Sequence, residues 1–174
     1  MADILHRWPR HGTGRVIYSA ANAHTAARKR ITVSFPDPFV PPAGWVTQRS
    51  MAGGLLRERY GAGYVSIGIT FDHGSILAGW QTGRPEPSTV PEPATEFVDH
   101  LLGRARLGDY LLDLRGRTPE RVRHWLDGPG KPRIYSGSYY DAAQDSKFFM
   151  GLDGWGRGFD ALLHLDTTTA ARLP

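Results

Sequence analysis

The chain has 174 residues, of which 40% are hydrophobic and 22% charged, so it has the length and apolar content for one globular domain with its own core. It contains no cysteine, which excludes disulfides, thiolate catalysis and cysteine-ligated metal centres. The net charge is only +4, and the basic run at residues 28–30 has no interleaved aromatic residues, which argues against a nucleic-acid partner. We find no signal peptide and no run long enough to span a membrane, so we expect a cytoplasmic protein without a membrane partner.

Residues 15–24 form an apolar run that ends in small residues, an amide and an imidazole. β-Branched and aromatic residues after a Gly-Thr-Gly turn predict a buried strand that delivers His24 to a site. Ligands bind beyond the carboxyl ends of strands in open α/β sheets, so Asn22 and His24 are candidate site residues. On this stretch alone, a purely structural histidine is the favoured interpretation.

The next elements are a short predicted strand at residues 31–35 and an extended, proline-rich loop at 36–44. Ser50 is the expected N-cap of a helix that ends at Gly61. The apolar side of this helix consists of Met51, Leu55, Leu56 and Tyr60. The two glycines at 53–54 weaken the helix, which indicates close packing on a neighbouring element.

Residues 64–71 alternate more regularly than any other stretch and predict a strand. One face carries Val65, Ile67, Ile69 and Phe71, and the other carries Tyr64, Ser66, Gly68 and Thr70. The small residues of the second face allow a helix or a ligand to approach the backbone. Asp72 and His73 follow directly and form a second candidate for the site, although a polar strand exit is the commoner explanation.

The remaining elements are expected in alternation. We predict a loop or lid at residues 79–93, a helix at 95–103, strands at 110–114, 133–136 and 159–166, and a helix from 118 to 127. Residues 138–158 are rich in aromatics and too irregular to assign. Together these elements predict one domain over residues 1–174 with an α/β fold, a layered sheet with covering helices.

Histidine is the most reactive side chain available in a chain without cysteine, and seven are present. None belongs to an HExxH or HxH pattern, so the spacing predicts no metal site. The sequence lacks a Gly-x-Ser-x-Gly elbow, and the glycine-rich stretch at 151–158 lacks the Gly-Lys-Ser/Thr ending of a phosphate loop. The sequence therefore gives no reason to expect a cofactor.

The segment Ser-Ala-Ala-Asn-Ala-His at residues 19–24 resembles the Ala-His-Asn-(Ala/Gly)-His segment of the erythromycin esterase family. Residues 49–71 are similar to the helix-and-strand signature of the same family, and residues 74–78, 110–115 and 159–164 are similar to later family segments. The similar segments occur in the same order as in the family and extend through most of the chain.

The resemblance implies a metal-independent hydrolase of macrolactone esters, in which a histidine assisted by a glutamate activates water. It implies a small-molecule ester or macrolide as substrate and a role in antibiotic resistance. By position, it assigns catalysis to His24 and substrate binding to Asn22; we add Asp72 and His73 as substrate-binding candidates because they follow the neighbouring strand.

Two departures from the family pattern put independent activity in doubt. Family members are more than twice as long, and their Gly-Glu-x-x-His-Gly motif does not occur in this sequence. Ala21 stands where the family has the first histidine of His-Asn-x-His. We therefore expect a truncated, C-terminal part of an incomplete esterase-like domain that is inactive alone, with an N-terminal half on another chain left open.

Two alternatives remain at this point. The first is that the chain is a noncatalytic ligand-binding or regulatory module. The second is that it is a decaying gene product without a stable function. The second alternative predicts poor solubility, because a half-sheet exposes strand edges and apolar faces.

Overall fold

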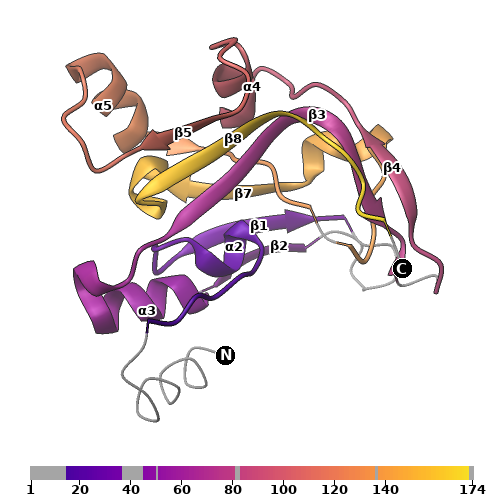
Figure 1. Ribbon diagram of the computed structural model, residues 1–174. Helices are drawn as coiled ribbons and strands as arrows, with labels where there is room; N and C mark the ends of the chain where they lie inside the picture. The colour runs from indigo at the N-terminus through magenta and orange to yellow at the C-terminus, as the bar shows by residue number, and fades with distance from the viewer. Residues whose placement is uncertain (1–14, 37–44, 50, 81–82, 136, 173–174) are drawn as a thin grey trace.

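The computed structural model describes residues 15–36, 45–49, 51–80, 83–135 and 137–172. Within these residues the strands form two four-stranded sheets, with strand orders β2-β1-β7-β6 and β4-β3-β8-β5. Figure 1 shows the long, curved strands β3 and β8 lying over β7, β1 and β2. The fold is thus a layered α/β arrangement, as the sequence predicts.

The two sheets differ in how their strands pair. The first contains β1 (Ile31–Phe35), β2 (Trp45–Arg49), β6 (Pro129–Gly130) and β7 (Phe149–Asp153). The second contains β3 (Ile67–Ala78), β4 (Glu86–Val90), β5 (Tyr110–Asp113) and β8 (Ala161–Thr168). Among the described strands only β3 and β8 pair in parallel.

Strand β3 changes neighbours along its length. Residues 67–74 pair with β8, whereas the other edge of β3 pairs with β4 only at residues 74–78. In the described part of the chain, the edge of residues 67–71 that faces away from β8 has no strand beside it. That free edge meets α2.

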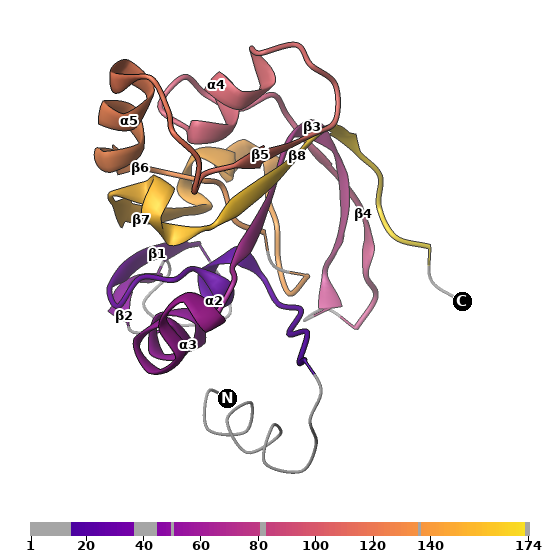
Figure 2. The same ribbon diagram turned by 60° about the vertical axis from the view of Figure 1, so that its left-hand side comes forward.

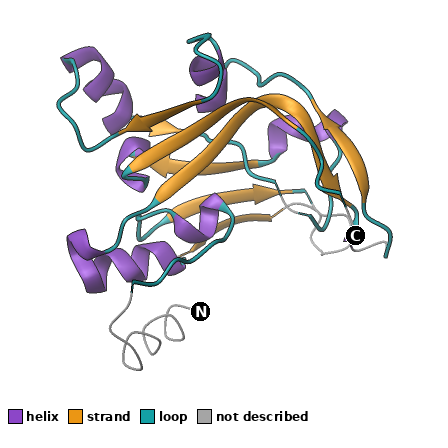
Figure 3. Ribbon diagram, viewed as in Figure 1, coloured by secondary structure: helices purple, strands orange, loops and turns teal. Residues whose placement is uncertain are grey.

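Short helices cover parts of the sheets (Figure 3). They are α2 (Asn22–Thr25), α3 (Ala52–Tyr60), α4 (Val98–Gly103), α5 (Glu120–Asp127), and the 3₁₀ turns η2 (Gly61–Gly63), η4 (Ala142–Lys147) and η5 (Trp155–Gly158). Figure 2 shows α4 and α5 side by side next to β5, where they share an apolar groove. No helix among the described residues has the length and apolar character needed to cross a membrane.

The main core lies between the two sheets and beneath α4 and α5. Its buried side chains include Ile31, Val98, Leu102, Leu126, Met150, Leu152, Trp155, Phe159 and Leu162. A smaller core of Ala78, Val90, Tyr140 and Phe148 lies at the β4 end. The described residues thus have two apolar clusters, a larger one between the sheets and a smaller one toward β4.

Several predicted elements are confirmed. The strand at residues 31–35 and the strands around 110–114 and 159–166 are present, as are the three predicted helices. The helix predicted after Ser50 ends at Gly61, whose φ of +52° suits glycine. Ser50 itself and most of the 36–44 loop lie outside the described residues.

The prediction of a buried strand at residues 15–24 is wrong. Residues 15–21 have no regular structure, Ile17 is 96% exposed, and residues 22–25 form α2. In the described part of the chain residues 15–21 form no ladder with any strand, and the contact with β3 at Ile69 is made by the Asn22 side chain. A strand-like sequence forms a strand only where a ladder partner is available.

Two smaller corrections concern loops and strands. The predicted loop at 79–93 contains β4, because its residues 86–90 pair with β3. The predicted strand at 133–136 reduces to one bridge between Arg133 and Phe149. The side chain of Arg133 makes more hydrogen bonds in this stretch than the single backbone bridge does.

Candidate functional site

Helix α2 carries Asn22 and His24 and is fixed to β3 through a side chain. The Asn22 amide nitrogen donates to the Ile69 carbonyl at 2.6 Å, and the Asn22 Oδ1 accepts from the Ile69 N–H at 3.0 Å. The carboxamide thus pairs with β3 as the backbone of a neighbouring strand would. One amide hydrogen of Asn22 remains for another partner.

The C-terminal end of α2 is held as firmly as its start. The Thr25 carbonyl accepts from the Tyr64 hydroxyl at 2.6 Å and from the Ser66 hydroxyl at 2.7 Å. A Cβ on Gly53 would lie 2.2 Å from the same carbonyl oxygen, so only glycine lets α3 approach α2 this closely. This contact confirms the close packing predicted for the glycines of α3.

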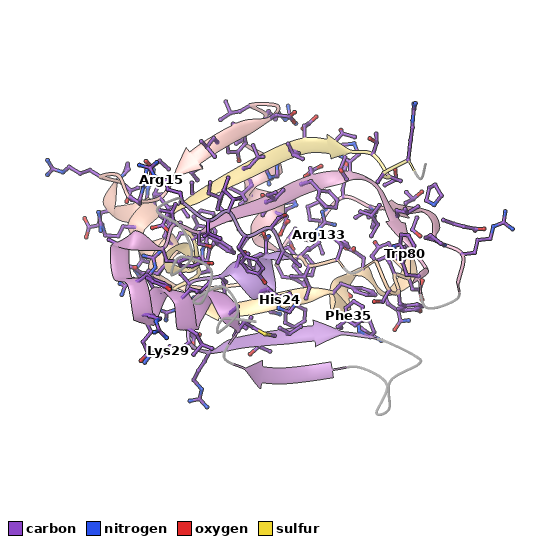
Figure 4. All side chains as sticks on the ribbon, turned by 60° about the horizontal axis from the view of Figure 1, so that its bottom comes forward. Arg15, His24, Lys29, Phe35, Trp80 and Arg133 are labelled. Atoms are coloured by element: carbon purple, nitrogen blue, oxygen red, sulfur yellow. The ribbon has the colours of Figure 1, made fainter. Side chains whose placement is uncertain are left out.

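The result is a four-residue helix whose candidate site residues are held by these hydrogen bonds. Ala23, Thr25 and Ala26 are buried, whereas Ala21 and His24 are exposed. Figure 4 shows His24 in the same central part of the view as Phe35 and Arg133, with Arg15 and Trp80 toward opposite ends. A helix this short has little stability of its own, so these anchors determine where His24 lies.

The His24 imidazole makes no hydrogen bond or ion pair with another described residue. Its backbone N–H bonds to the Ala21 carbonyl at 2.8 Å, which places residues 21 and 24 at the two ends of one turn. A histidine in place of Ala21 would therefore stand beside His24. In this chain the side chain beside His24 is the methyl group of Ala21.

Asp72 and His73 lie within β3 and not beyond its end as predicted, because the strand continues to Ala78, and they form a hydrogen-bonded pair. The Asp72 Oδ2 and the His73 Nδ1 are 3.0 Å apart, and their side chains are 19% and 43% exposed. They lie three and four residues beyond Ile69, which is about 10 to 13 Å along an extended strand. Among the described residues, no hydrogen bond or ion pair joins this pair to His24 or Asn22.

A buried polar cluster centred on Arg133 is the feature that sequence reasoning missed. The Arg133 side chain is fully buried and its Nη1 lies 3.2 Å from Asp145 Oδ2. The guanidinium also donates to the carbonyls of Phe71, Asp72 and Pro91 at 2.5 to 3.0 Å. These bonds join the middle of β3 to the segment after β4 and to η4.

Two carboxylates complete the Arg133 cluster. Asp99 Oδ2 accepts from the Arg133 backbone N–H at 2.9 Å, and Asp145 Oδ1 accepts from the Tyr140 hydroxyl at 2.8 Å. Burial raises the pKa of Asp99 to about 6, although the nearby Arg133 charge acts in the opposite direction. No sequence motif marks this cluster, because its members come from α4, η4 and an irregular segment.

A second buried pair lies on the inner face of β3 and β8. Thr70 Oγ1 and His164 Nδ1 are 2.9 Å apart, and His164 is 1% exposed. Burial lowers the pKa of His164, so the imidazole is neutral at neutral pH. Its Nε2 is buried without a hydrogen-bond partner in the described residues.

Two surface grooves lie elsewhere on the molecule. One, of about 400 Å³, is lined by residues of β1, β6 and β7 together with Arg30, Glu96 and Lys131. The other, of about 290 Å³, is the apolar groove between α4, β5 and α5. Neither groove includes Asn22, His24, Asp72 or His73. No group of three or more His, Asp or Glu residues in the described part is arranged to hold a metal ion.

Comparison with known proteins identifies the family of this chain. A sequence model of the erythromycin esterase family matches residues 1–168. Curated proteins give no match. A crystal structure of a Bacillus cereus protein is similar with a TM-score of 0.68 and 20% identity, over 94% of this chain and 36% of that chain. A crystal structure titled as a succinoglycan biosynthesis protein is similar with a TM-score of 0.60 and 21% identity, over 85% of this chain and 32% of that chain.

The two structural relatives share the fold of this chain, and the chain spans about a third of the length of each. The family match extends over both the α2 segment with its Asn-Ala-His sequence and the β3 strand that anchors it. By this match the chain belongs to the erythromycin esterase family.

Proposed function

We propose that this chain supplies the His24 side of a carboxylic-ester hydrolase active site and does not complete the reaction alone. The observation that carries the proposal is the anchoring of α2, whose Asn22 side chain bonds to β3 and whose Thr25 carbonyl bonds to Tyr64 and Ser66 just before β3, while the His24 imidazole stays exposed. An imidazole acts as a general base only if it is held within hydrogen-bond reach of its substrate, so such anchoring serves catalysis.

The proposed reaction is hydrolysis of a macrolactone or another small carboxylic ester. His24 would accept the proton of a water molecule as that water attacks the ester carbonyl, and the developing oxyanion would need nearby donors. Asn22 already uses both ends of its amide on Ile69, so its role in this proposal is chiefly to position His24. The Asp72 and His73 pair would contact the substrate farther along β3.

The proposed lack of independent activity rests on the chemistry of the sequence. A neutral imidazole is a better base when a carboxylate orients it, and the family's Gly-Glu-x-x-His-Gly motif does not occur in the printed sequence. Ala21 also removes the imidazole that would stand beside His24. His24 would thus work together with groups from another polypeptide segment.

The test is incubation of the purified chain with erythromycin and with a p-nitrophenyl ester, followed by mass spectrometry of the products. We expect the same background hydrolysis from the chain and from its His24→Ala variant. Turnover by the chain that His24→Ala abolishes would contradict the proposed dependence on another segment. His124→Ala, which changes an exposed histidine on α5, is the matched control.

Ala21 favours one second candidate function, a noncatalytic ligand-binding module. Replacement of an imidazole by a methyl group removes acid–base chemistry but keeps the exposed surface of α2 available to an apolar ligand. Calorimetric titration with erythromycin distinguishes the candidates. Saturable binding without turnover, weakened by His24→Ala, would support this second function, and absence of binding would exclude it for macrolides.

A further inference from the structure

The second sheet carries several apolar side chains on one face that are more than half exposed in the described structure. Ile69 of β3, Leu163 of β8 and Leu111 of β5 are register partners across three adjacent strands, so their side chains lie on one face. We define the open face as Val65, Ile67, Ile69 and Leu111, which are 54%, 54%, 53% and 64% exposed. Val65, Ile67 and Ile69 follow one another along β3 and the residues just before it, and Leu111 lies on the same face two strands away, beyond Leu163.

Such a face is unusual for the sheet to which it belongs. Strands β3 and β8 pair in parallel, and parallel strands in proteins are normally covered on both faces. Here α4 and the core cover one face, whereas on the other face Phe71 stacks on Tyr135 and only the part of β3 around Ile67 and Ile69 stays more than half exposed. A contiguous exposed apolar surface on a water-exposed domain marks a place where another polypeptide or ligand packs.

The open face is continuous with the helix that carries His24. Asn22 bonds to the backbone of Ile69, and the Thr25 carbonyl accepts from Tyr64 and Ser66 just before β3. Helix α2 therefore lies beside the N-terminal part of β3, and the almost fully exposed Ile17 belongs to the segment that leads into this helix. Anything that covers the open face also approaches His24.

The edge of β3 restricts how a partner can bind. Asn22 occupies the backbone groups of Ile69, and the Arg133 guanidinium occupies the Phe71 carbonyl at 3.0 Å. A partner strand would have to displace both side chains before it could pair with this edge. The partner therefore packs on the face, which suits the apolar side of α-helices laid across a sheet.

The solved relatives indicate what the partner is. Their chains contain this fold as 36% and 32% of their length, so about two thirds of each chain is additional polypeptide. We propose that the open face docks a partner polypeptide that corresponds to this remaining part of an erythromycin esterase-family domain. This inference deepens the proposed function, because docking there would bring new acid and base groups next to His24.

The absence of native cysteine makes a direct test simple. Ile69→Cys places one thiol on the open face, and Thr169→Cys places one thiol on an exposed residue past the end of β8 as the matched control. The probe is the Bacillus cereus relative produced without the third of its chain that matches this one. The rate of maleimide labelling of each variant is followed by mass spectrometry with and without the probe.

We expect the probe to slow labelling of Ile69→Cys at least tenfold and to leave Thr169→Cys unchanged. Ile67→Asp should abolish the protection, whereas Leu107→Asp, which changes a still more exposed apolar residue outside the open face, should keep it. In a second arm of the experiment the chain and the probe are produced as one fused polypeptide, because linkage raises the effective concentration of a weakly binding partner. Protection in either arm supports the proposal.

Two results would overturn the proposal. One is equal labelling of Ile69→Cys in the free chain and in both arms. The other is protection in the isolated chain that grows with its own concentration, which would assign the open face to a second copy. Labelling reports docking without hydrolysis, so protection without turnover would refute the proposed esterase function and leave the docking site intact.

Discussion

The two faces of the sheet formed by β4, β3, β8 and β5 invert the usual relation between polarity and burial. The inner face presents Gly68 and Thr70 of β3 together with Ser66 just before it, all buried, whereas the outer face presents Ile67 and Ile69, each more than half exposed. The inner face is buried because α4 and the core pack on it, and its polar groups are hydrogen-bonded. Burial here follows from what packs on a face, not from how apolar that face is.

The comparison also separates residues that hold the fold from residues available for function. The inner face and the Arg133 cluster are closed to solvent, and most of their polar atoms have partners. The outer face and α2 hold His24 and an apolar surface without partners in the described structure. Substitutions on the two sides should therefore affect different measurements.

The largest effect is expected inside. Arg133→Met should destabilise the chain by about 3–5 kcal/mol, because it leaves two buried carboxylates without their cation. Urea unfolding measures the change. Arg157→Met is the control, since its ion pair with Asp127 is largely exposed and should be worth less than about 1 kcal/mol. Equal losses for both variants would contradict a structural role for the buried cluster.

The contrast between the faces can be tested at adjacent positions of β3. Gly68→Val should cost about 1–3 kcal/mol, because a Cβ would lie 2.7 Å from Leu162 Cδ2 and 2.9 Å from Phe159 Cδ1. Ile69→Thr, on the open face, should change the free energy of unfolding by no more than about 0.5 kcal/mol. Thermal or urea unfolding of both variants checks the comparison, and a larger loss for Ile69→Thr would reverse it.

A smaller effect is expected at the junction of α2 and β3. Asn22→Ala removes two hydrogen bonds to the Ile69 backbone and should cost about 1 kcal/mol. Hydrogen exchange of the Ile69 amide should become faster in this variant. Ser19→Ala, an exposed neighbour, serves as control. Unchanged exchange at Ile69 would show that Asn22 does not hold α2 in place.

The smallest effect is a dependence of stability on pH that arises from His164. Because burial lowers its pKa, the unfolded chain takes up the proton first as pH falls below about 6.5, and the folded state loses stability. His164→Gln, which can still bond to Thr70, should flatten this loss between about pH 7.5 and 5.5. Unfolding midpoints across this range provide the measurement.

Asp99 contributes to pH dependence in the opposite direction. Its pKa is raised to about 6, so its stabilising protonated form is lost as pH rises through that value. Asp99 is present in both the parent chain and His164→Gln, so the difference between their pH profiles of stability reports on His164 alone. A steeper acid loss in His164→Gln than in the parent would contradict the assignment.

Local sequence determined much of the chain's secondary structure and its family. Alternation predicted β3, capping and glycine signals predicted α3 and its end at Gly61, and the Asn-Ala-His segment with the strand that follows indicated the erythromycin esterase family. These features depend on neighbouring residues, so the printed sequence was enough to recognise them.

Tertiary structure decided which faces are covered and what becomes of the opening apolar run. Residues 15–21 have the composition of a strand but are mostly exposed and form no ladder, and it is the Asn22 side chain that bonds to the edge of β3. The Arg133 cluster and the open face likewise depend on contacts between segments far apart in the chain. Periodicity shows that a strand has two different faces, but only the packing of other elements determines which face meets water.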